Sequence, residues 1–292
     1  MKKAASLFLA LTMALSLTAC GAGGASSGAA SSGSGSASSS QQAEPVEITV
    51  FAAASMTETL DQIIENYKTV VPEVTVTPSY ASSGDLLKQI KNGAECDLFI
   101  SAAQKQMNAL DGSLKGDAEK NPDGLDELAE GSRVDLLENK VTLAVPEGNP
   151  KGIESFDQLA ELLKSGDVFL AIGNSDVPVG QYTLKIFDYY GIDEASIADK
   201  LTYGSNVKEV TTQISEGTVD CGIIYATDAY SAGLSVVDSA TADMCGQVIY
   251  PAAVLKTSGD QARQDAAQTF LDYLQTDACA KIFESVGFTP LG

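Results

Sequence analysis

The run Ile48-Thr49-Val50-Phe51-Ala52-Ala53-Ala54-Ser55 indicates a buried strand that passes directly into a serine-bearing turn. A second turn of the same kind, Tyr80-Ala81-Ser82-Ser83-Gly84, follows the alternating run Val74-Thr75-Val76. Each turn opens a predicted helix, so each presents a hydroxyl beside backbone N–H groups that lack an intrahelical partner. Such a position suits an anion. The chain contains no histidine, and we therefore expect a molecule bound here to be held and not chemically attacked.

Strand and helix patterns alternate along the rest of the chain. Leu60, Ile63 and Tyr67 repeat at helical spacing and mark one apolar helix face. Further helix patterns occur at 181–190, from 207, at 262–274 and at 278–286, and strand patterns occur at 47–51, 74–77, 97–100, 141–145, 168–172, 222–225 and 248–255. Strands separated by helices in this way predict an α/β fold with mainly parallel sheets. In such sheets ligands bind at the carboxyl ends of the strands, where both serine turns are expected.

The spacing of the two turns, taken alone, favours a purely structural interpretation. Ser55-Met56-Thr57-Glu58 matches a capping box, and Ser82 with Asp85 nearly repeats it. A capping serine can still donate its own proton, so capping and anion binding are compatible. A Glu58 carboxylate that reached back to the Ser55 amide would compete with a bound anion. If the turn binds an anion, we therefore expect Glu58 to point into solvent.

The first 45 residues predict export and attachment to a membrane. Residues 1–19 combine two lysines with a short apolar stretch, which is typical of a signal peptide. The run Leu17-Thr18-Ala19-Cys20 resembles a bacterial lipobox and implies a diacylglycerol on Cys20; the alternative is an ordinary signal peptide followed by a chance cysteine. Residues 20–45 are rich in Gly, Ala and Ser and predict a disordered tether. We therefore expect the protein on the extracytoplasmic face of the cell membrane, anchored by lipid.

The chain is strongly acidic. Its formal charge of −21 at pH 7 becomes −23 once Lys2 and Lys3 leave with the signal peptide. Such a surface argues against nucleic acid as a partner and against direct adhesion to anionic lipid. It also repels an anionic ligand, so an anion site in this chain has to work against the field of the whole protein.

Four cysteines remain beyond Cys20, and an extracytoplasmic protein can form disulfides. No two of them form a Cys-x-x-Cys pair, and without histidine a zinc site is not expected. Cys96 and Cys221 lie at the edges of apolar strand runs and predict small buried thiols. The pair Cys245 and Cys279 is the one disulfide that we consider.

The acidic segment 111–130 contains oxygen-bearing side chains at alternating positions, which hints at a calcium loop. These residues are Asp117, Glu119, Asn121 and Asp123. However, Pro122 stands where the sharp turn of such a loop needs glycine. We therefore predict a solvated loop, and we expect no metal ligands in the chain.

Several short motifs follow one another in a fixed order between residues 47 and 289. They are the two serine turns, Cys96-Asp97-Leu98-Phe99-Ile100-Ser101-Ala102, Val177-Pro178-Val179-Gly180-Gln181-Tyr182, Asn206-Val207-Lys208-Glu209, Gly222-Ile223-Ile224-Tyr225, Tyr250-Pro251-Ala252 and Gly287-Phe288-Thr289. In the order and spacing of these motifs, rather than in any one of them, the sequence resembles the molybdate-binding receptors of bacterial ABC transporters.

This resemblance implies a two-lobed periplasmic-binding-protein fold of type II, with the ligand in the cleft between the lobes. Each lobe is expected to contain a mixed, mainly parallel sheet flanked by helices. Lobe 1 is expected to comprise 46–138 plus 248–292, and lobe 2 to comprise 139–247. The resemblance also implies a monomer that carries molybdate or tungstate, needs no cofactor, and delivers its ligand to an ABC permease with its ATPase.

Five ligand contacts are implied by the same resemblance, and all of them are neutral hydrogen-bond donors. They are Ser55 and Ser83 through hydroxyl and amide, Val179 and Val207 through their amides, and Tyr225 through its phenol. Val179 departs from the small residue that is common in the family, which matters little where only its N–H is used. Neutral donors with helix N-termini would hold a dianion without lysine or arginine. A site made only of donors would reject protonated phosphate.

Two other functions remain as alternatives. The first is a receptor for another tetrahedral oxyanion, of which sulfate is the foremost example. The second is a serine-based enzyme, which the sequence disfavours because it has no histidine and because neither Ser55 nor Ser83 stands in a Ser-x-x-Lys motif. We therefore expect a binding protein and no catalytic residues.

Overall fold

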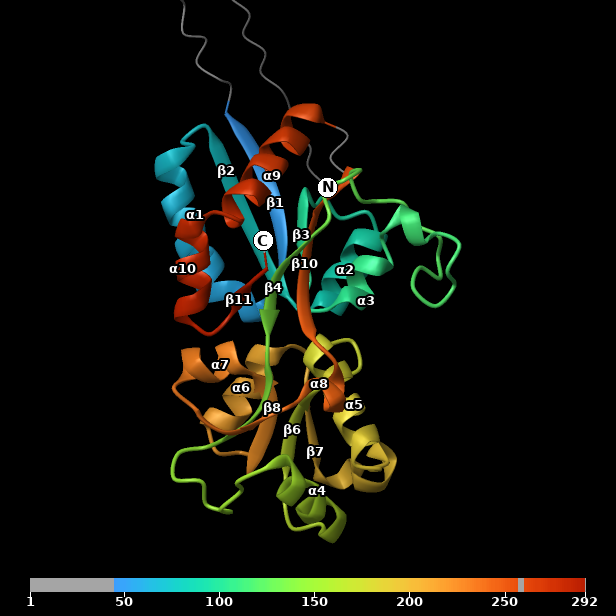
Figure 1. Ribbon diagram of the computed structural model, residues 1–292, viewed down its shortest axis with the longest axis vertical. Helices are drawn as coiled ribbons and strands as arrows, with labels where there is room; N and C mark the ends of the chain where they lie inside the picture. The colour runs from blue at the N-terminus through green and yellow to red at the C-terminus, as the bar shows by residue number, and fades with distance from the viewer. Residues whose placement is uncertain (1–44, 257–259, 292) are drawn as a thin grey trace, which may run out of the picture. The chain divides into compact units, whose positions relative to one another are not determined.

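The computed structural model describes residues 45–256 and 260–291. The predicted signal peptide 1–19 and the lipidation of Cys20 lie outside these residues, as does nearly all of the predicted tether 20–45. Within the described ranges the chain forms two β-sheets, each flanked by helices (Figure 1). No helix in these ranges is both long and apolar enough to cross a bilayer.

The first sheet has six strands in the order β11-β4-β10-β3-β1-β2. Its strands are β1 (Val46–Ala53), β2 (Val74–Ala81), β3 (Leu98–Ile100), β4 (Val134–Asn139), β10 (Val248–Val254) and β11 (Thr289–Pro290). The helices of this part are α1 (Thr57–Val70), α2 (Ser83–Lys91), α3 (Gln104–Asn108), α9 (Gln261–Leu274) and α10 (Asp277–Ser285). Figure 1 shows α1 and α10 on the β2 side of this sheet, and α2 and α3 on the β3 and β10 side. We call this part the first lobe.

The second sheet has five strands in the order β7-β6-β8-β5-β9. Its strands are β5 (Val141–Val145), β6 (Leu170–Gly173), β7 (Leu201–Gly204), β8 (Cys221–Tyr225) and β9 (Ser235–Ser239). Its helices are α4 (Phe156–Ser165), α5 (Pro178–Tyr189), α6 (Val207–Ser215), α7 (Ala226–Ala232) and α8 (Ala242–Cys245). We call this part the second lobe. Short 3₁₀ segments complete the described elements: η1 (Ala54–Met56), η2 (Gly112–Leu114) and η3 (Glu194–Lys200).

The expected pair of mixed sheets flanked by helices is confirmed, but the sheets are not mainly parallel. Parallel pairing joins β1 to β2 and β3 in the first sheet, and β6 to β7 and β8 in the second. Antiparallel pairing joins β10 to β3 and β4, β11 to β4, and β5 to β8 and β9. The strands next to the passages between the lobes, β4, β5 and β10, pair antiparallel because they are not joined to their neighbours by βαβ crossovers.

Helix α1 shows how the apolar pattern of the sequence builds the first lobe. Leu60, Ile63 and Tyr67 are fully buried, as their helical spacing predicts. The Tyr67 ring packs against Phe270 of α9 with ring centroids 4.9 Å apart. Helix α1 thus packs into the core with the apolar face that the sequence marks.

The cysteines do not form the disulfide that we considered. Cys245 lies in α8 of the second lobe and Cys279 in α10 of the first, and both are thiols. Cys96 and Cys221 are buried thiols, as their positions in the sequence predict. The Cys245–Cys279 pairing is therefore wrong, because the two residues belong to helices of different lobes.

Asn121 organises the acidic segment 111–130 through side-chain hydrogen bonds. Asn121 is 1% exposed, and its side-chain nitrogen donates to the carbonyls of Asp111 and Leu125. Asp117 and Asp123 each pair with a lysine. Among the residues described, no group of three or more acidic, cysteine or histidine side chains is placed to hold a metal ion.

Candidate functional site

The two serine turns differ in the way they use their side chains. Ser82 caps α2, because its Oγ accepts from the Asp85 amide at 3.1 Å, as the capping pattern predicts. Ser83 is the first residue of α2 and is not its cap. Ser55 lies inside η1, and α1 begins behind Met56 without a side-chain cap. The capping-box interpretation is therefore wrong at Ser55, where the hydroxyl is left for another partner.

The hydroxyl of Ser83 is arranged to donate its proton. The residue is fully buried, and its Oγ accepts from the backbone amide of Ala102 at 3.0 Å. Because the oxygen acts as acceptor in this bond, the hydroxyl proton remains available to a second group. The bond crosses from the start of α2 to the segment after β3, and therefore fixes the direction of the hydroxyl.

A chain of hydrogen bonds allows Ser55 the same donor character. The side-chain nitrogen of Asn139 donates to the Tyr250 hydroxyl at 3.2 Å, and the Asn139 oxygen accepts from the Lys140 amide. The Tyr250 hydroxyl lies 2.9 Å from Ser55 Oγ. With one Tyr250 lone pair occupied by Asn139, the Tyr250 proton can serve Ser55 Oγ, and Ser55 keeps its own proton for a ligand. Neither Asn139 nor Tyr250 was given a role from the sequence.

Tyr225 presents an unsatisfied hydroxyl at the same place. The residue ends β8, is 1% exposed, and its OH has no hydrogen-bond partner among the residues described. Its ring packs edge-on against Tyr250 with centroids 5.7 Å apart. Burial raises the pKa of Tyr225 well above its ordinary value, so the hydroxyl keeps its proton. A buried hydroxyl without a partner costs free energy, which points to a ligand that would accept from it.

Two helices of the second lobe begin at the same cavity. Val207 is the first residue of α6, whose cap Asn206 accepts from the Glu209 amide at 3.1 Å. Helix α5 begins at Pro178, so Val179 belongs to its first turn. The first-turn amides of both helices lack intrahelical acceptors and carry partial positive charge. The two amides predicted from the sequence therefore stand at helix starts.

Ser55, Ser83, Val207 and Tyr225 line one small cavity between the lobes. Its other lining residues are Ala53, Ala54, Ala81, Ser82, Ala102, Val177 and Pro178. Val179 is fully buried and is not among the lining residues, so the structure brings four of the five predicted residues together and leaves the fifth next to the cavity. The cavity measures about 10 Å³, close to the room that one water needs on this measure.

The comparisons with known proteins agree with this fold. Residues 48–289 match the family model described as bacterial extracellular solute-binding protein. This chain belongs to that family. The solute-binding protein described here is 34% identical over 246 residues to YvgL of Bacillus subtilis, which is named as an ABC transporter substrate-binding lipoprotein. The match covers 84% of this chain and 86% of YvgL.

Two further relatives have names that refer to molybdate or molybdenum. The solute-binding protein is 32% identical over 253 residues to the molybdate-binding protein ModA of Escherichia coli, covering 85% of this chain and 90% of ModA. It also matches the solved substrate-binding domain of a Clostridium difficile protein assigned to a molybdenum ABC transporter. That match has a TM-score of 0.61 and 30% identity, and covers 85% of this chain and all of the other. This chain has the two-lobed type II fold of periplasmic binding proteins, which it shares with that solved domain.

Glu58 connects the two lobes of this solute-binding protein across the edge of the site. Its carboxylate oxygens both accept from Lys208 Nζ at 2.8 Å, and its side chain is 51% exposed. The sequence predicts that Glu58 points into solvent; it is half exposed, but it is also paired with a lysine. Because the Glu58 carboxylate is bound to Lys208 on α6, it does not occupy the Ser55 turn, which stays open to an anion.

Asp228 is a buried carboxyl that sequence reasoning missed. It is 1% exposed in α7, and Lys208 Nζ lies 3.5 Å from its Oδ1. Burial raises the pKa of the Asp228 carboxyl to about 7, although the Lys208 ammonium acts in the opposite direction. Lys208 thus stands between an exposed carboxylate of the first lobe and a buried carboxyl of the second.

The Asp228→Asn variant should gain thermal stability over the unaltered protein as the pH rises. Between the ordinary pKa of 3.8 and the folded value of about 7, the folded protein keeps a proton that the unfolded chain releases. The contribution of Asp228 to stability therefore falls as pH rises through this window and is constant above it. Melting curves from pH 5 to pH 8 should show a gain in Tm that grows to at least about 3 °C. Asp199→Asn, at an exposed position, is the control; a gain that does not change with pH would contradict the argument.

The lobes also approach each other closely at Gly84. A Cβ built on Gly84 of α2 would lie 2.1 Å from the carbonyl oxygen of Asp176 in the second lobe. Beside this contact, Lys88 Nζ donates to Asp176 Oδ2 at 2.6 Å. Gly84 is therefore required for the closed arrangement, because any larger residue would collide with backbone across the cleft.

Proposed function

We propose that the protein is an extracytoplasmic receptor that binds molybdate and tungstate and delivers them to an ABC permease and its ATPase. The observation that carries this proposal is the buried Tyr225 hydroxyl, which has no partner among the described residues and lines a cavity with two serines. Both serine hydroxyls already accept, or can accept, a bond from the protein and have a proton to donate. The names of the ModA and Clostridium difficile relatives support the choice of molybdate.

The ligand of such a site is an anion that only accepts hydrogen bonds. The described residues that line the cavity include no charged side chain. Donors from both lobes, together with the amides at the starts of α5 and α6, would surround a tetrahedral dianion. A hydrogen bond to a charged group contributes about 1.5–3 kcal/mol, so several of them in a dry cavity can offset the desolvation of the ion. We assign the ligand contacts to Ser55, Ser83, Val179, Val207 and Tyr225.

A site of this kind binds and does not catalyse. Serine attack requires a base near the hydroxyl. In the described structure the neighbours of the two hydroxyls are the Tyr250 phenol and the Ala102 amide, and neither is a base at neutral pH. We propose accordingly that the oxyanion is released unaltered.

The membrane anchor and the boundaries of the lobes complete the proposed receptor. We propose that residues 1–19 are removed, that Cys20 carries the lipid anchor, and that 20–45 is the tether; the lipoprotein relative in Bacillus subtilis supports this. We place lobe 1 at 46–138 plus 248–292 and lobe 2 at 139–247. The sheet to which each strand belongs supports these boundaries. We expect the receptor to act as a monomer.

Calorimetric titration with molybdate, tungstate, sulfate and phosphate tests the proposal directly. We expect one molybdate or tungstate per protein, with sulfate bound at least about tenfold more weakly because the smaller ion cannot reach donors on both lobes at once. Monohydrogen phosphate should not bind, because its hydroxyl finds no acceptor. Tight sulfate binding would favour the sulfate receptor, and the absence of any molybdate signal would overturn the assignment.

A further inference from the structure

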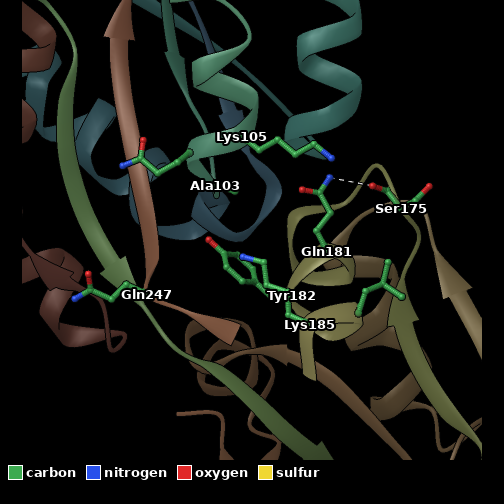
Figure 2. A pocket seen from close by; sticks show the side chains of 9 residues that line it. Ala103, Lys105, Ser175, Gln181, Tyr182, Lys185 and Gln247 are labelled. Carbon is green, nitrogen blue, oxygen red and sulfur yellow. Dashed lines mark hydrogen bonds between the residues drawn. The ribbon is translucent and has the colours of Figure 1, made fainter. Parts of the chain in front are cut away.

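A second and larger cavity lies beside the proposed oxyanion site. Its volume is about 560 Å³. Figure 2 shows Lys105 extending from α3 toward Gln181 of α5, with Tyr182 and Lys185 on the same helix and Gln247 just before β10. Its walls therefore come from both lobes and from the segment that joins them.

The charge of this cavity is opposite to that of the whole chain. Two lysines line it, Lys105 and Lys185, and no carboxylate is among its described lining residues. Neither lysine belongs to the ion pairs found among residues 45–256 and 260–291. Lys185 Nζ donates to the Cys245 carbonyl at 3.3 Å and lies 5.1 Å from the centre of the Tyr182 ring. In a chain of formal charge −21, a concave region whose charged lining residues are both cations is a local exception.

The cavity adjoins the oxyanion site along two chain segments. Ala103, which lines the larger cavity, directly follows Ala102, which lines the small one. On the second lobe, Gln181 lies one turn beyond Pro178, which lines the small cavity. A hydrogen bond of 3.4 Å from Gln106 to Gln181 joins the two lobes beside the larger cavity. The larger cavity and the oxyanion site are thus lined by neighbouring residues on both lobes.

We propose that this cavity is the entrance for the oxyanion, where Lys105 and Lys185 attract the dianion before it moves to the neutral site. This inference rests on the proposed function. A surface of strong negative charge repels a dianion, and neutral donors with helix dipoles attract only over a short distance. Cations at the mouth create a local positive potential whose reach is set by the Debye length, about 8 Å at physiological salt.

The two lysines suit capture and release better than permanent binding. A lysine ammonium is a strongly hydrated point charge without the rigid fork by which arginine holds an oxyanion bidentately. Both lysines are exposed, so an ion beside them keeps most of its water. They are expected to raise the association rate and to leave the dissociation rate of the bound ion unchanged.

The test compares association rates in two double variants that lose the same charge. One is Lys105→Gln with Lys185→Gln; the control is Lys115→Gln with Lys281→Gln, at two exposed positions that do not line this cavity. The chain has ten tyrosines and no tryptophan, so stopped-flow tyrosine fluorescence with molybdate can follow binding. At about 0.02 M salt we expect association threefold to tenfold slower than in the control variant, with dissociation within about twofold. At about 0.5 M salt the difference should disappear.

Three results would contradict the proposed role of this cavity as the entrance for the oxyanion. Equal association rates in the two variants would show that the lysines do not steer the ion. If the variant without Lys105 and Lys185 lost affinity through faster dissociation, the two lysines would belong to the binding site itself. Two molybdates per protein in the titration would make the cavity a second resident site. Failure of the proposed function is recognised separately, because the unaltered protein would then give no molybdate signal at all.

Discussion

Gly84→Ala is expected to weaken molybdate binding by at least about 10²-fold while both lobes remain folded. The added methyl would lie 2.1 Å from the Asp176 carbonyl oxygen, which is backbone and cannot turn away. The lobes would then stop short of closure, and the second-lobe donors, including Tyr225 and Val207, could not reach an ion held by Ser55 and Ser83. Titration calorimetry measures the loss, and circular dichroism checks the fold.

The matched control for this change is Gly116→Ala. A Cβ at Gly116 meets no atom within 4 Å, so this variant carries the same chemical change without the collision. Small-angle scattering adds an independent reading, since molybdate should compact the control and not Gly84→Ala. A Gly84→Ala protein that binds as tightly as the control would show that the closed contact is not needed for binding.

Tyr225→Phe is expected to weaken molybdate binding about tenfold to a hundredfold and to leave the ligand-free protein at least as stable as before. The phenol is buried and without a partner among the described residues, so its removal deletes an unsatisfied group from the free protein. With the oxyanion bound, the same removal deletes a charge-assisted hydrogen bond. Calorimetry gives the affinity, and melting curves without ligand give the stability.

The Tyr67→Phe variant is the control that separates the effect on stability from the effect on molybdate affinity. The Tyr67 hydroxyl is also buried without a partner among the residues described, but it lies in the core of the first lobe against Phe270. Both variants should therefore keep or gain stability, and only Tyr225→Phe should lose affinity. A Tyr225→Phe protein with unchanged affinity would remove Tyr225 from the site.

Local patterns predicted much of the fold, including α1 and the strands β1, β2, β5 and β8. The strands β4, β7, β9 and β11 were not predicted, because they are short or carry mixed polarity and depend on pairing for their form. The antiparallel share of each sheet was underestimated for a related reason: strand direction near the passages between lobes depends on where the chain crosses, not on local periodicity. The Cys245–Cys279 pairing failed because proximity between helices of different lobes has no local signal.

The candidate site also has features that the sequence predicted and features that it did not. From sequence, the serine turns, the helix start at 207 and the lack of histidine already indicate a place for an anion held by neutral donors. The start of α5 at Pro178 was not predicted, because the sequence pattern marked this helix only from 181. Spacing alone nevertheless favoured capping at Ser55. That interpretation failed because the partner of Ser55 is Tyr250, 195 residues further along the chain.

The chemical type of the donors therefore follows from residues that are neighbours in the sequence, since turns and helix starts are local structures. The availability of each proton does not, because it depends on bonds such as Asn139 to Tyr250 that form only when β4 and β10 lie side by side. The pairing of Glu58 with Lys208 and the contact at Gly84 likewise arise only where the lobes meet. Hydrogen bonds and ion pairs act over a few ångströms, and folding alone brings residues so far apart in the chain within that range.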